Sequence, residues 1–315
     1  MFAMSMFNTG DFRIACDYIK ERRPLVVNVT NYVAMTPSAN ALLAIGASPI
    51  MVVEPSEVEE IVEKSAALVL NIGCLEGSQI EVMKLAAARA SELDIPWVLD
   101  PAGVGMSWLR TDTAVQLIRK YKPAVIRSNA SEIAALASAL IDAHEYEQPL
   151  SFSPGGGIDF EKAMQEVGFV SNGVDSSMDS KSALEYARKL AKFTGSIVSL
   201  SGEVDYITDG VKIVSLSNGS PLMPRVTAMG CIASAVTAAF LSVTCCSEEN
   251  KRMDYLQAAV NAMALMGVAG EKAHELCEQS STAGTGSFFV NFLDVLSGFD
   301  AAELAGRVKE EFEKQ

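Results

Sequence analysis

Short apolar runs alternate along the first two thirds of the chain with longer segments that have the period of an amphipathic helix. The runs have the length of buried strands, and they predict strands at 25–29, 49–53, 67–72, 96–100, 124–128 and 197–201. The segments between them predict helices at 38–45, 56–66, 77–93, 111–121 and 129–140. Because strands that alternate with helices are typical of βαβ units, we expect a mainly parallel sheet with helices on both faces.

The alternation stops after residue 141. Residues 142–177 are rich in glycine, proline and polar groups, so we expect loops around a short helix near 160–167. Two runs that flank Asp209-Gly210 predict a hairpin, with strands at 204–208 and 211–216. The remaining helical segments are 178–193, 255–277, 287–297 and 301–313.

No internal repeat and no long linker divides the chain. We therefore predict one α/β domain over residues 1–315 with a mainly helical C-terminal part. Residues 1–19 form an N-terminal extension in this interpretation, and residues 142–172 a divergent loop excursion. The pattern assigns no function to either segment.

The composition is that of a packed globular protein with an acidic balance. Hydrophobic residues make up 49% of the chain and charged residues 20%, and the formal charge is −14. Because nucleic-acid binders carry a basic face, we expect neither nucleic acid nor an anionic membrane as a partner. Any polyanion that binds must be held locally, by backbone amides or by one or two basic side chains.

The use of cysteine and histidine argues against a zinc site. The chain has six cysteines, no Cys-x-x-Cys pair and only two histidines. Scattered free thiols suit a reducing cytoplasm, and the first residues lack the basic and apolar regions of a signal peptide. We therefore expect a cytoplasmic protein.

Residues 226–246 contain no charged residue. The segment is long enough to span a membrane, but it consists mostly of Ala, Ser, Thr, Cys and Val. Small residues let a helix pack closely against other backbone. The composition therefore favours a buried central helix.

Polar side chains and one methionine stand where the predicted parallel strands end, and open α/β sheets bind ligands at such ends. They are Asn31, Met51, Asp100, Arg127 and Ser201. Asp100 has two interpretations that the pattern leaves equal: a ligand for a metal–phosphate complex, or a turn residue satisfied by local amides. Met51 is more typical of core packing than of ligand contact.

Residues 129–132 have the spacing of a capping box, with Asn129 as N-cap and Glu132 at the third helical position. Spacing alone favours this structural role. Glu132 can also order magnesium and water, because a capped first turn holds its carboxylate in place. Arg127 has two interpretations as well, since it can pair with Asp100 or Glu132, or clamp a nucleotide phosphate.

Ala228, Met229, Gly230 and Cys231 place consecutive N–H groups at the head of the uncharged segment. Such groups form an anion site that can cradle a phosphate without cationic side chains. A helix N-terminus also lowers the pKa of a thiol, so Cys231 would accept the proton of a substrate hydroxyl. The alternative is a buried thiol that packs as a small hydrophobe, and spacing leaves both open.

Several sequence blocks, kept in order, resemble the hydroxyethylthiazole kinase family. They include PLVVNVTNYVAM at 24–35, ANALLAIGASPIM at 39–51, IPWVLDPAGVG at 95–105, AVIRSNASEIAAL at 124–136 and SNGSPLMPRVTAMGC at 217–231. The resemblance implies a ribokinase-like three-layer α/β/α sandwich. It also implies a homotrimer that uses ATP and magnesium to phosphorylate 4-methyl-5-(2-hydroxyethyl)thiazole for thiamine biosynthesis.

The matching motifs imply a role for each candidate residue. Cys231 falls on the catalytic cysteine of the family, and the anion hole on Ala228, Met229, Gly230 and Cys231. The thiazole contacts fall on Asn31, Met51 and Ala228, the ATP contacts on Arg127 and Ser201, and the magnesium ligands on Asp100 and Glu132.

One motif departs from the family pattern, which reads Thr-Gly-x-Gly-Cys. This chain has Ala228, and Ala restricts the positive φ that Gly allows. Met229 adds bulk beside the expected phosphate. Two alternatives therefore stay open: another ribokinase-like kinase, acting on hydroxymethylpyrimidine or pyridoxal, or a thiazole-binding homologue with weak turnover.

Overall fold

A computed structural model describes residues 7–142, 178–245, 254–279 and 284–311. The predicted helix near 160–167 and nearly all of the 142–172 excursion lie outside the described residues.

Nine strands of the described chain form one sheet, in the order β2-β1-β3-β4-β5-β6-β7-β8-β9. The first six are parallel, whereas β7, β8 and β9 pair antiparallel. The bounds are β1 Leu25–Val29, β2 Ser48–Met51, β3 Ala67–Asn71, β4 Trp97–Asp100, β5 Val125–Asn129, β6 Ile197–Ser201, β7 Asp205–Thr208, β8 Ile213–Leu216 and β9 Glu310–Glu311. The prediction of a mainly parallel sheet is confirmed.

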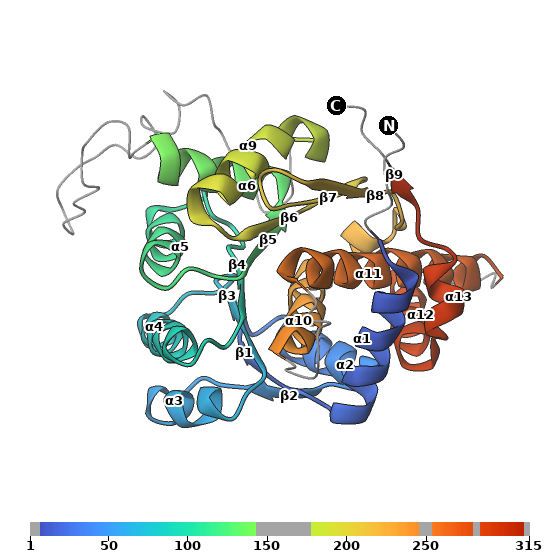
Figure 1. Cartoon of the computed structure of the whole chain (residues 1–315), viewed down its shortest axis with the longest axis horizontal. Coiled ribbons are helices and arrows are strands. Elements are labelled where there is room, and N and C mark those ends of the chain that lie inside the picture. The colour runs from blue at the N-terminus through green and yellow to red at the C-terminus, as the bar shows by residue number, and fades with distance from the viewer. Residues whose placement is uncertain (1–6, 143–177, 246–253, 280–283, 312–315) are drawn as a thin grey trace.

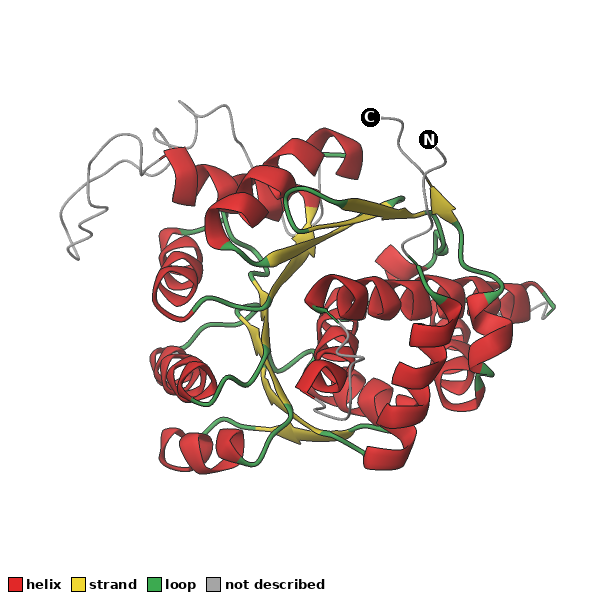
Figure 2. Ribbon diagram, in the orientation of Figure 1, coloured by secondary structure: helices red, strands yellow, loops and turns green. Residues whose placement is uncertain are grey.

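Helices cover both faces of the curved sheet, which gives three layers (Figures 1 and 2). One face carries α3 Pro55–Glu63, α4 Gly77–Glu92, α5 Trp108–Tyr121, α6 Ala130–Ala137 with its π-helical extension Ser138–Asp142, and α9 Ser180–Thr194. The concave face carries α1 Thr9–Arg22, α2 Met35–Ile45, α10 Met229–Leu241, α11 Tyr255–Glu278, α12 Thr285–Gly298 and α13 Ala301–Ala305. The three-layer α/β/α expectation is therefore confirmed.

The uncharged segment becomes α10, the central helix of the concave layer (Figure 1). Every residue of α10 is buried except Gly230 and Cys231, at the end nearest the strand termini. The small residues let α10 pack against α2, α11, β3 and β4. No helix in the described ranges is long and apolar enough to cross a membrane.

The chain differs from the sequence prediction at both ends. The N-terminal helix α1, which the pattern did not predict, buries Phe12, Ala15, Cys16 and Ile19 in the core. The helix predicted at 301–313 was wrong beyond Ala305. After Gly306 the backbone is more stable as an added strand, because β8 offers an unpaired edge for it.

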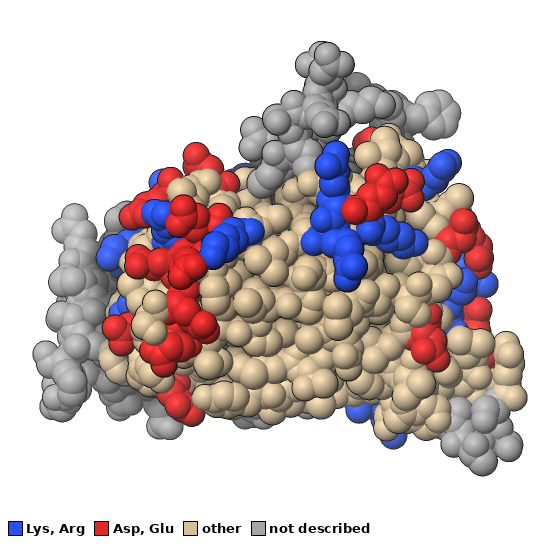
Figure 3. Space-filling view, turned by 90° about the horizontal axis from the view of Figure 1, so that it is seen from below, with Lys and Arg blue, Asp and Glu red and all other residues tan. Residues whose placement is uncertain are grey.

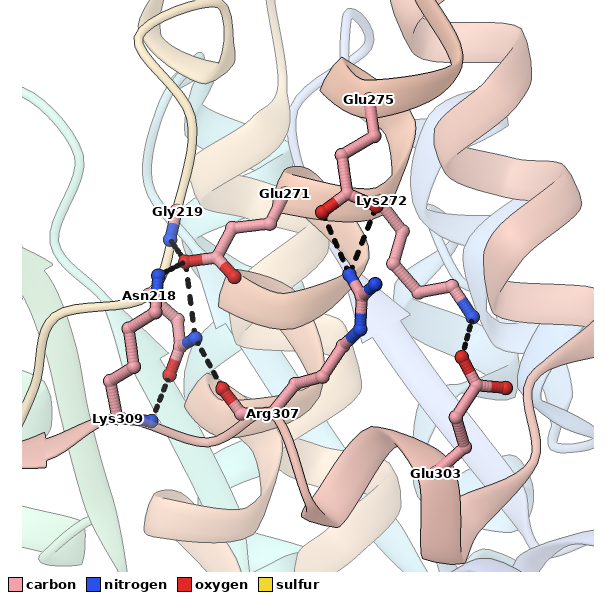
Figure 4. Close-up of polar contacts among 8 residues, drawn as sticks. All are labelled: Asn218, Gly219, Glu271, Lys272, Glu275, Glu303, Arg307 and Lys309. Atoms are coloured by element: carbon pink, nitrogen blue, oxygen red, sulfur yellow. Dashed lines mark hydrogen bonds and ion pairs between the residues drawn. The ribbon is translucent and has the colours of Figure 1, made fainter.

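Side-chain contacts hold this last strand in place (Figure 4). The buried Asn218 donates to the carbonyl of Arg307 over 2.9 Å and accepts from the backbone N–H of Lys309 over 2.7 Å. Glu271 of α11 accepts from Asn218 over 3.1 Å and from Lys309 Nζ over 2.8 Å. These contacts also tie the segment before α10 to α11, since Asn218 lies in that segment.

Candidate active site

The carboxyl ends of the parallel strands converge on the head of α10. Parallel register places Asn71 of β3 beside Asp100 of β4, and Asn129 of β5 beside Ser201 of β6. Helix α10 packs across β3 and β4 on the same side of the sheet. The candidate residues from these strands therefore meet the first turn of α10.

Ala228 is the N-cap of α10 and has a left-handed backbone, with φ 67° and ψ 2°. Its carbonyl accepts from the N–H of Ile232 over 2.8 Å, and no side chain caps this end. The first N–H groups of an α-helix have no partner within the helix. Those of Met229, Gly230 and Cys231 are therefore available to an anion.

The guanidinium of Arg127 of β5 lies close to Gly230. A Cβ atom on Gly230 would come 2.7 Å from Arg127 Nη1, so a larger residue there would have to displace the guanidinium. The Nη2 of Arg127 donates to Ser201 Oγ over 2.8 Å, and its buried Nε has no partner in the described ranges. No carboxylate among the described residues forms an ion pair with Arg127, which favours the phosphate-clamp interpretation.

The thiol of Cys231 accepts hydrogen bonds from two asparagines. The Nδ2 of Asn71 lies 3.2 Å from Sγ, and the Nδ2 of Asn31 lies 3.4 Å from it. Asn31 also donates to Asn71 Oδ1 over 2.8 Å. The two asparagines thus hold one another and the sulfur.

The expectation of a lowered thiol pKa at Cys231 was wrong. Burial, together with the negative charge of Asp100, raises the pKa of this thiol to about 12. The hydrogen bonds from the asparagines and the charge of Arg127 act in the opposite direction but are outweighed. At neutral pH the sulfur is therefore a protonated thiol in the ligand-free chain.

Asp100 is buried and faces α10. Its Oδ2 accepts from Ser234 Oγ over 2.8 Å, so its partner comes from another element rather than from the turn that follows β4. Burial raises the pKa of Asp100, while Arg127, Ser234 and Asn71 favour the ionised form. An additional cation would offset the cost of burying this charge.

Glu132 takes the capping role that its sequence position suggested, and its buried carboxylate also reaches the loop after β4. The capping box is present, with Glu132 N–H bonded to Asn129 Oδ1 over 3.0 Å. The carboxylate also accepts from the N–H of Gly103 over 2.6 Å and from Ser128 Oγ. Burial raises the pKa of Glu132 and the charge of Asp100 raises it further, so the two carboxylates lie within electrostatic reach of one another.

No group of three or more His, Cys, Asp and Glu side chains in the described ranges is arranged to hold a metal ion. Asp100 and Glu132 supply only two carboxylates. Magnesium is commonly held by one or two carboxylates together with substrate phosphates and water. The donor set therefore fits magnesium bound jointly with a nucleotide.

Met51 stands apart from the other candidates. It ends β2, the edge strand, and is partly exposed. β1 and β3 separate it from Asp100 on β4. The structure thus gathers Asn31, Asp100, Arg127, Glu132, Ser201 and the 228–231 turn, and leaves Met51 at the rim.

Sequence reasoning did not single out Asn71 and Ser234. Asn71 carried a usable signal, because it is the polar residue that ends the run ALVLN, as Asp100 ends WVLD. Ser234 follows Cys231 by three positions, so the two share a helix face. That signal was hidden among the other small residues of α10.

The model of the hydroxyethylthiazole kinase family matches residues 16–144 and 162–301. A hydroxyethylthiazole kinase from Brachyspira hyodysenteriae is 42% identical over 292 residues, which cover 93% of this chain and 95% of that protein. The solved structure of a hydroxyethylthiazole kinase protein from Pyrococcus horikoshii has a TM-score of 0.74 and 30% identity, and covers 96% of this chain and 99% of that one.

A more distant solved structure bears on the fold alone. A ribokinase-like superfamily protein from Enterococcus faecalis has a TM-score of 0.52 at 13% identity and covers 94% of this chain and 90% of that one. The ribokinase-like expectation for the architecture is confirmed.

Proposed function

Because the chain belongs to the hydroxyethylthiazole kinase family, we propose that it transfers the γ-phosphoryl group of ATP to the hydroxyl of 4-methyl-5-(2-hydroxyethyl)thiazole. The product is the thiazole phosphate used in thiamine biosynthesis. The chain is a kinase, as its relatives are.

One observation carries the proposal: a guanidinium that forms no ion pair in the described ranges lies beside the uncapped N-terminus of α10. The guanidinium of Arg127 lies 2.7 Å from the position that a Cβ on Gly230 would occupy, and Gly230 belongs to the first turn of α10. Both bind phosphate oxygens well. This local arrangement lets a chain of net charge −14 hold a triphosphate.

Each residue then has a share in phosphoryl transfer, which depends chiefly on positioning and electrostatics. Arg127 and Ser201 hold the nucleotide, and the amides of 229–231 receive the group in transfer. Asp100 and Glu132 would hold magnesium, which supplies positive charge to the phosphates when it is bound. Asn31 and Cys231 orient the thiazole hydroxyl, and the neutral thiol acts by hydrogen bonding rather than as a resting thiolate.

Ala228 supports a working turn. Its φ of 67° is the left-handed conformation that glycine adopts readily. An alanine pays about 1–2 kcal/mol for this conformation, and α10 still begins at the next residue, Met229. The geometry therefore favours turnover over the binding-only alternative, although Met229 is buried beside the site.

A homotrimer, as the resemblance implies, fits the surface around Met51. Residues 24–53 contain no charged residue, and Tyr32, Val33, Leu43 and Val53 are all about half exposed. Figure 3 shows a broad expanse without Lys, Arg, Asp or Glu on the side where Figure 1 places β2 and α2. Exposed apolar surface on an edge strand suits a subunit contact, which would bring a second copy close to Met51.

The decisive experiment compares ATP-dependent phosphorylation of three alcohols by the purified protein: the thiazole, hydroxymethylpyrimidine and pyridoxal. Mass spectrometry identifies each product. We expect a clear preference in kcat/KM for the thiazole. A preference for either other alcohol would replace the proposal with that activity, and thiazole binding without ADP formation would leave only the binding-protein alternative.

A further inference from the structure

Arg110 lies in the first turn of α5 and faces the loops that follow β3 and β4. Its Nη1 donates to the carbonyls of Ile72 and Ala102, over 2.9 and 2.7 Å. Its Nη2 donates to the carbonyl of Gly73 over 2.8 Å. One guanidinium therefore ties together two loops that are separated by about thirty residues of sequence.

The position of Arg110 is not explained by ordinary helix or surface electrostatics. A cation in the first turn opposes the helix dipole. No carboxylate in the described ranges pairs with it. The loop after β4 leaves space for the guanidinium of Arg110 through Gly103. A Cβ at that position would come 3.0 Å from Arg110 Nη1, and the φ of Gly103 is +76°. Within the described ranges its guanidinium donates only to backbone carbonyls, so the contact joins the two loops.

Both loops carry groups of the proposed active site. In the loop after β3, the N–H of Gly73 donates to Asn71 Oδ1 over 2.9 Å, and Asn71 in turn donates to the Cys231 thiol. In the loop after β4, the N–H of Gly103, the residue after Ala102, donates to Glu132 over 2.6 Å. Arg110 therefore contacts both the asparagine–thiol side and the carboxylate side without touching any of the reacting groups itself.

We propose that Arg110 is a positioning residue that sets the separation between the Asn71–Cys231 pair and the Asp100–Glu132 pair. Its planar fork reaches three carbonyls at once, which the single ammonium of lysine cannot reproduce. The catalytic role of Arg110 rests on the proposed kinase function. Its geometric role does not, because the accessibility of the Cys231 thiol can be measured by alkylation without turnover.

The test compares Arg110→Lys and Arg110→Met with the control Arg89→Lys. Arg89 lies on the surface of α4 and pairs with Glu63 and Glu92. Steady-state kinetics with the thiazole gives kcat and KM. Iodoacetamide labelling followed by peptide mass spectrometry gives the alkylation rate of Cys231, with the buried Cys277 as an internal reference.

We expect Arg110→Lys to lower kcat about 10- to 100-fold with little change in KM, because small misplacements of reacting groups are costly. We also expect alkylation of Cys231 to quicken several-fold, while Cys277 and the Arg89→Lys variant stay unchanged. Unchanged kcat and unchanged Cys231 labelling in a folded Arg110→Lys protein would overturn the proposal.

Two further results keep the test decisive. If neither Arg110 variant folds, as judged by the lack of a cooperative unfolding transition, Gly103→Ala replaces them, because its methyl group would press on the guanidinium of Arg110. We expect this variant to show faster alkylation of Cys231 than the wild type. Unchanged alkylation would overturn the proposal. If the wild-type chain does not phosphorylate the thiazole, the proposed function fails, and labelling of Cys231 still decides whether Arg110 sets the geometry.

Discussion

Asn71 Nδ2 lies 3.2 Å from the sulfur of Cys231, and this contact joins the end of β3 to the head of α10. The same side chain accepts from Asn31 and from the N–H of Gly73 through its Oδ1. Asn71 thus fixes the thiol, Asn31 and the loop after β3 together. Its removal frees all three.

Replacing Asn71 with alanine is therefore expected to lower kcat for thiazole phosphorylation about 10- to 100-fold. KM for ATP should change little, because Arg127 and Ser201 are untouched. Asn291→Ala is the matched control, since Asn291 donates to the remote Cys277 sulfur over 3.4 Å. Equal losses in both variants would mean that Asn71 serves stability alone.

Gly230→Ala tests the contact between the helix turn and Arg127. The added methyl group would press on Nη1 at 2.7 Å and displace the guanidinium from the nucleotide site. We expect KM for ATP to rise about tenfold or more, in line with the loss of a charge-assisted hydrogen bond. Gly286→Ala, where a Cβ meets nothing within 4 Å, should leave both kinetic constants unchanged.

Ala228→Gly removes the strain of a left-handed alanine. Relief of about 1–2 kcal/mol is offset in part by the larger entropy of glycine in the unfolded chain. We expect urea unfolding to show a free energy equal to or above that of the wild type, and kcat to stay the same or rise. Ala88→Gly, in the interior of α4, is the control and should lower the free energy of unfolding by about 1 kcal/mol. An equal loss for Ala228→Gly would show that Ala228 is not strained.

Asp205, which begins β7, gives a pH dependence of stability. Burial raises its pKa to about 7, although the N–H of Gly202 and the charge of Arg127 favour the ionised form. Between about pH 4 and pH 7 the folded chain keeps a proton that the unfolded chain has lost. This contribution therefore makes the free energy of unfolding fall as pH rises through that window.

The Asp205→Asn variant isolates this contribution, because the amide oxygen can still accept from Gly202. As the pH rises from 5 to 8, the free energy of unfolding of the variant should increase relative to that of the wild type by up to a few kcal/mol. Urea unfolding at both pH values measures the difference. A parallel change in the two proteins would show that Asp205 titrates normally.

The alternation of apolar runs and amphipathic segments predicted the layers of the fold because it records burial directly. The β1 run agrees with the strand residue for residue. The pattern failed after Ala305, where α13 ends and the chain goes on to pair with β8. A long-range pairing of this kind leaves no local signal.

The sequence pattern located side chains at the carboxyl ends of the strands to the extent that they end an apolar run. Asp100 and Ser201 end β4 and β6, and Asn71, which was passed over, ends β3. Arg127 lies inside β5, two residues before its end. The pKa of Cys231 could not be inferred from its place at a helix N-terminus, because burial and the charge of Asp100 outweigh the influences that lower it. Arg110 was invisible to the pattern, since its partners are backbone carbonyls of two distant loops.

The central claim is that the amides at the head of α10 hold the group in transfer. The most direct measurement is a crystal structure with magnesium, a non-hydrolysable ATP analogue and the thiazole alcohol. The account predicts the N–H groups of Met229, Gly230 and Cys231 within about 3.2 Å of oxygens on the terminal phosphate, with Arg127 on its other side. A terminal phosphate bound elsewhere, or amides directed away from it, would contradict the account.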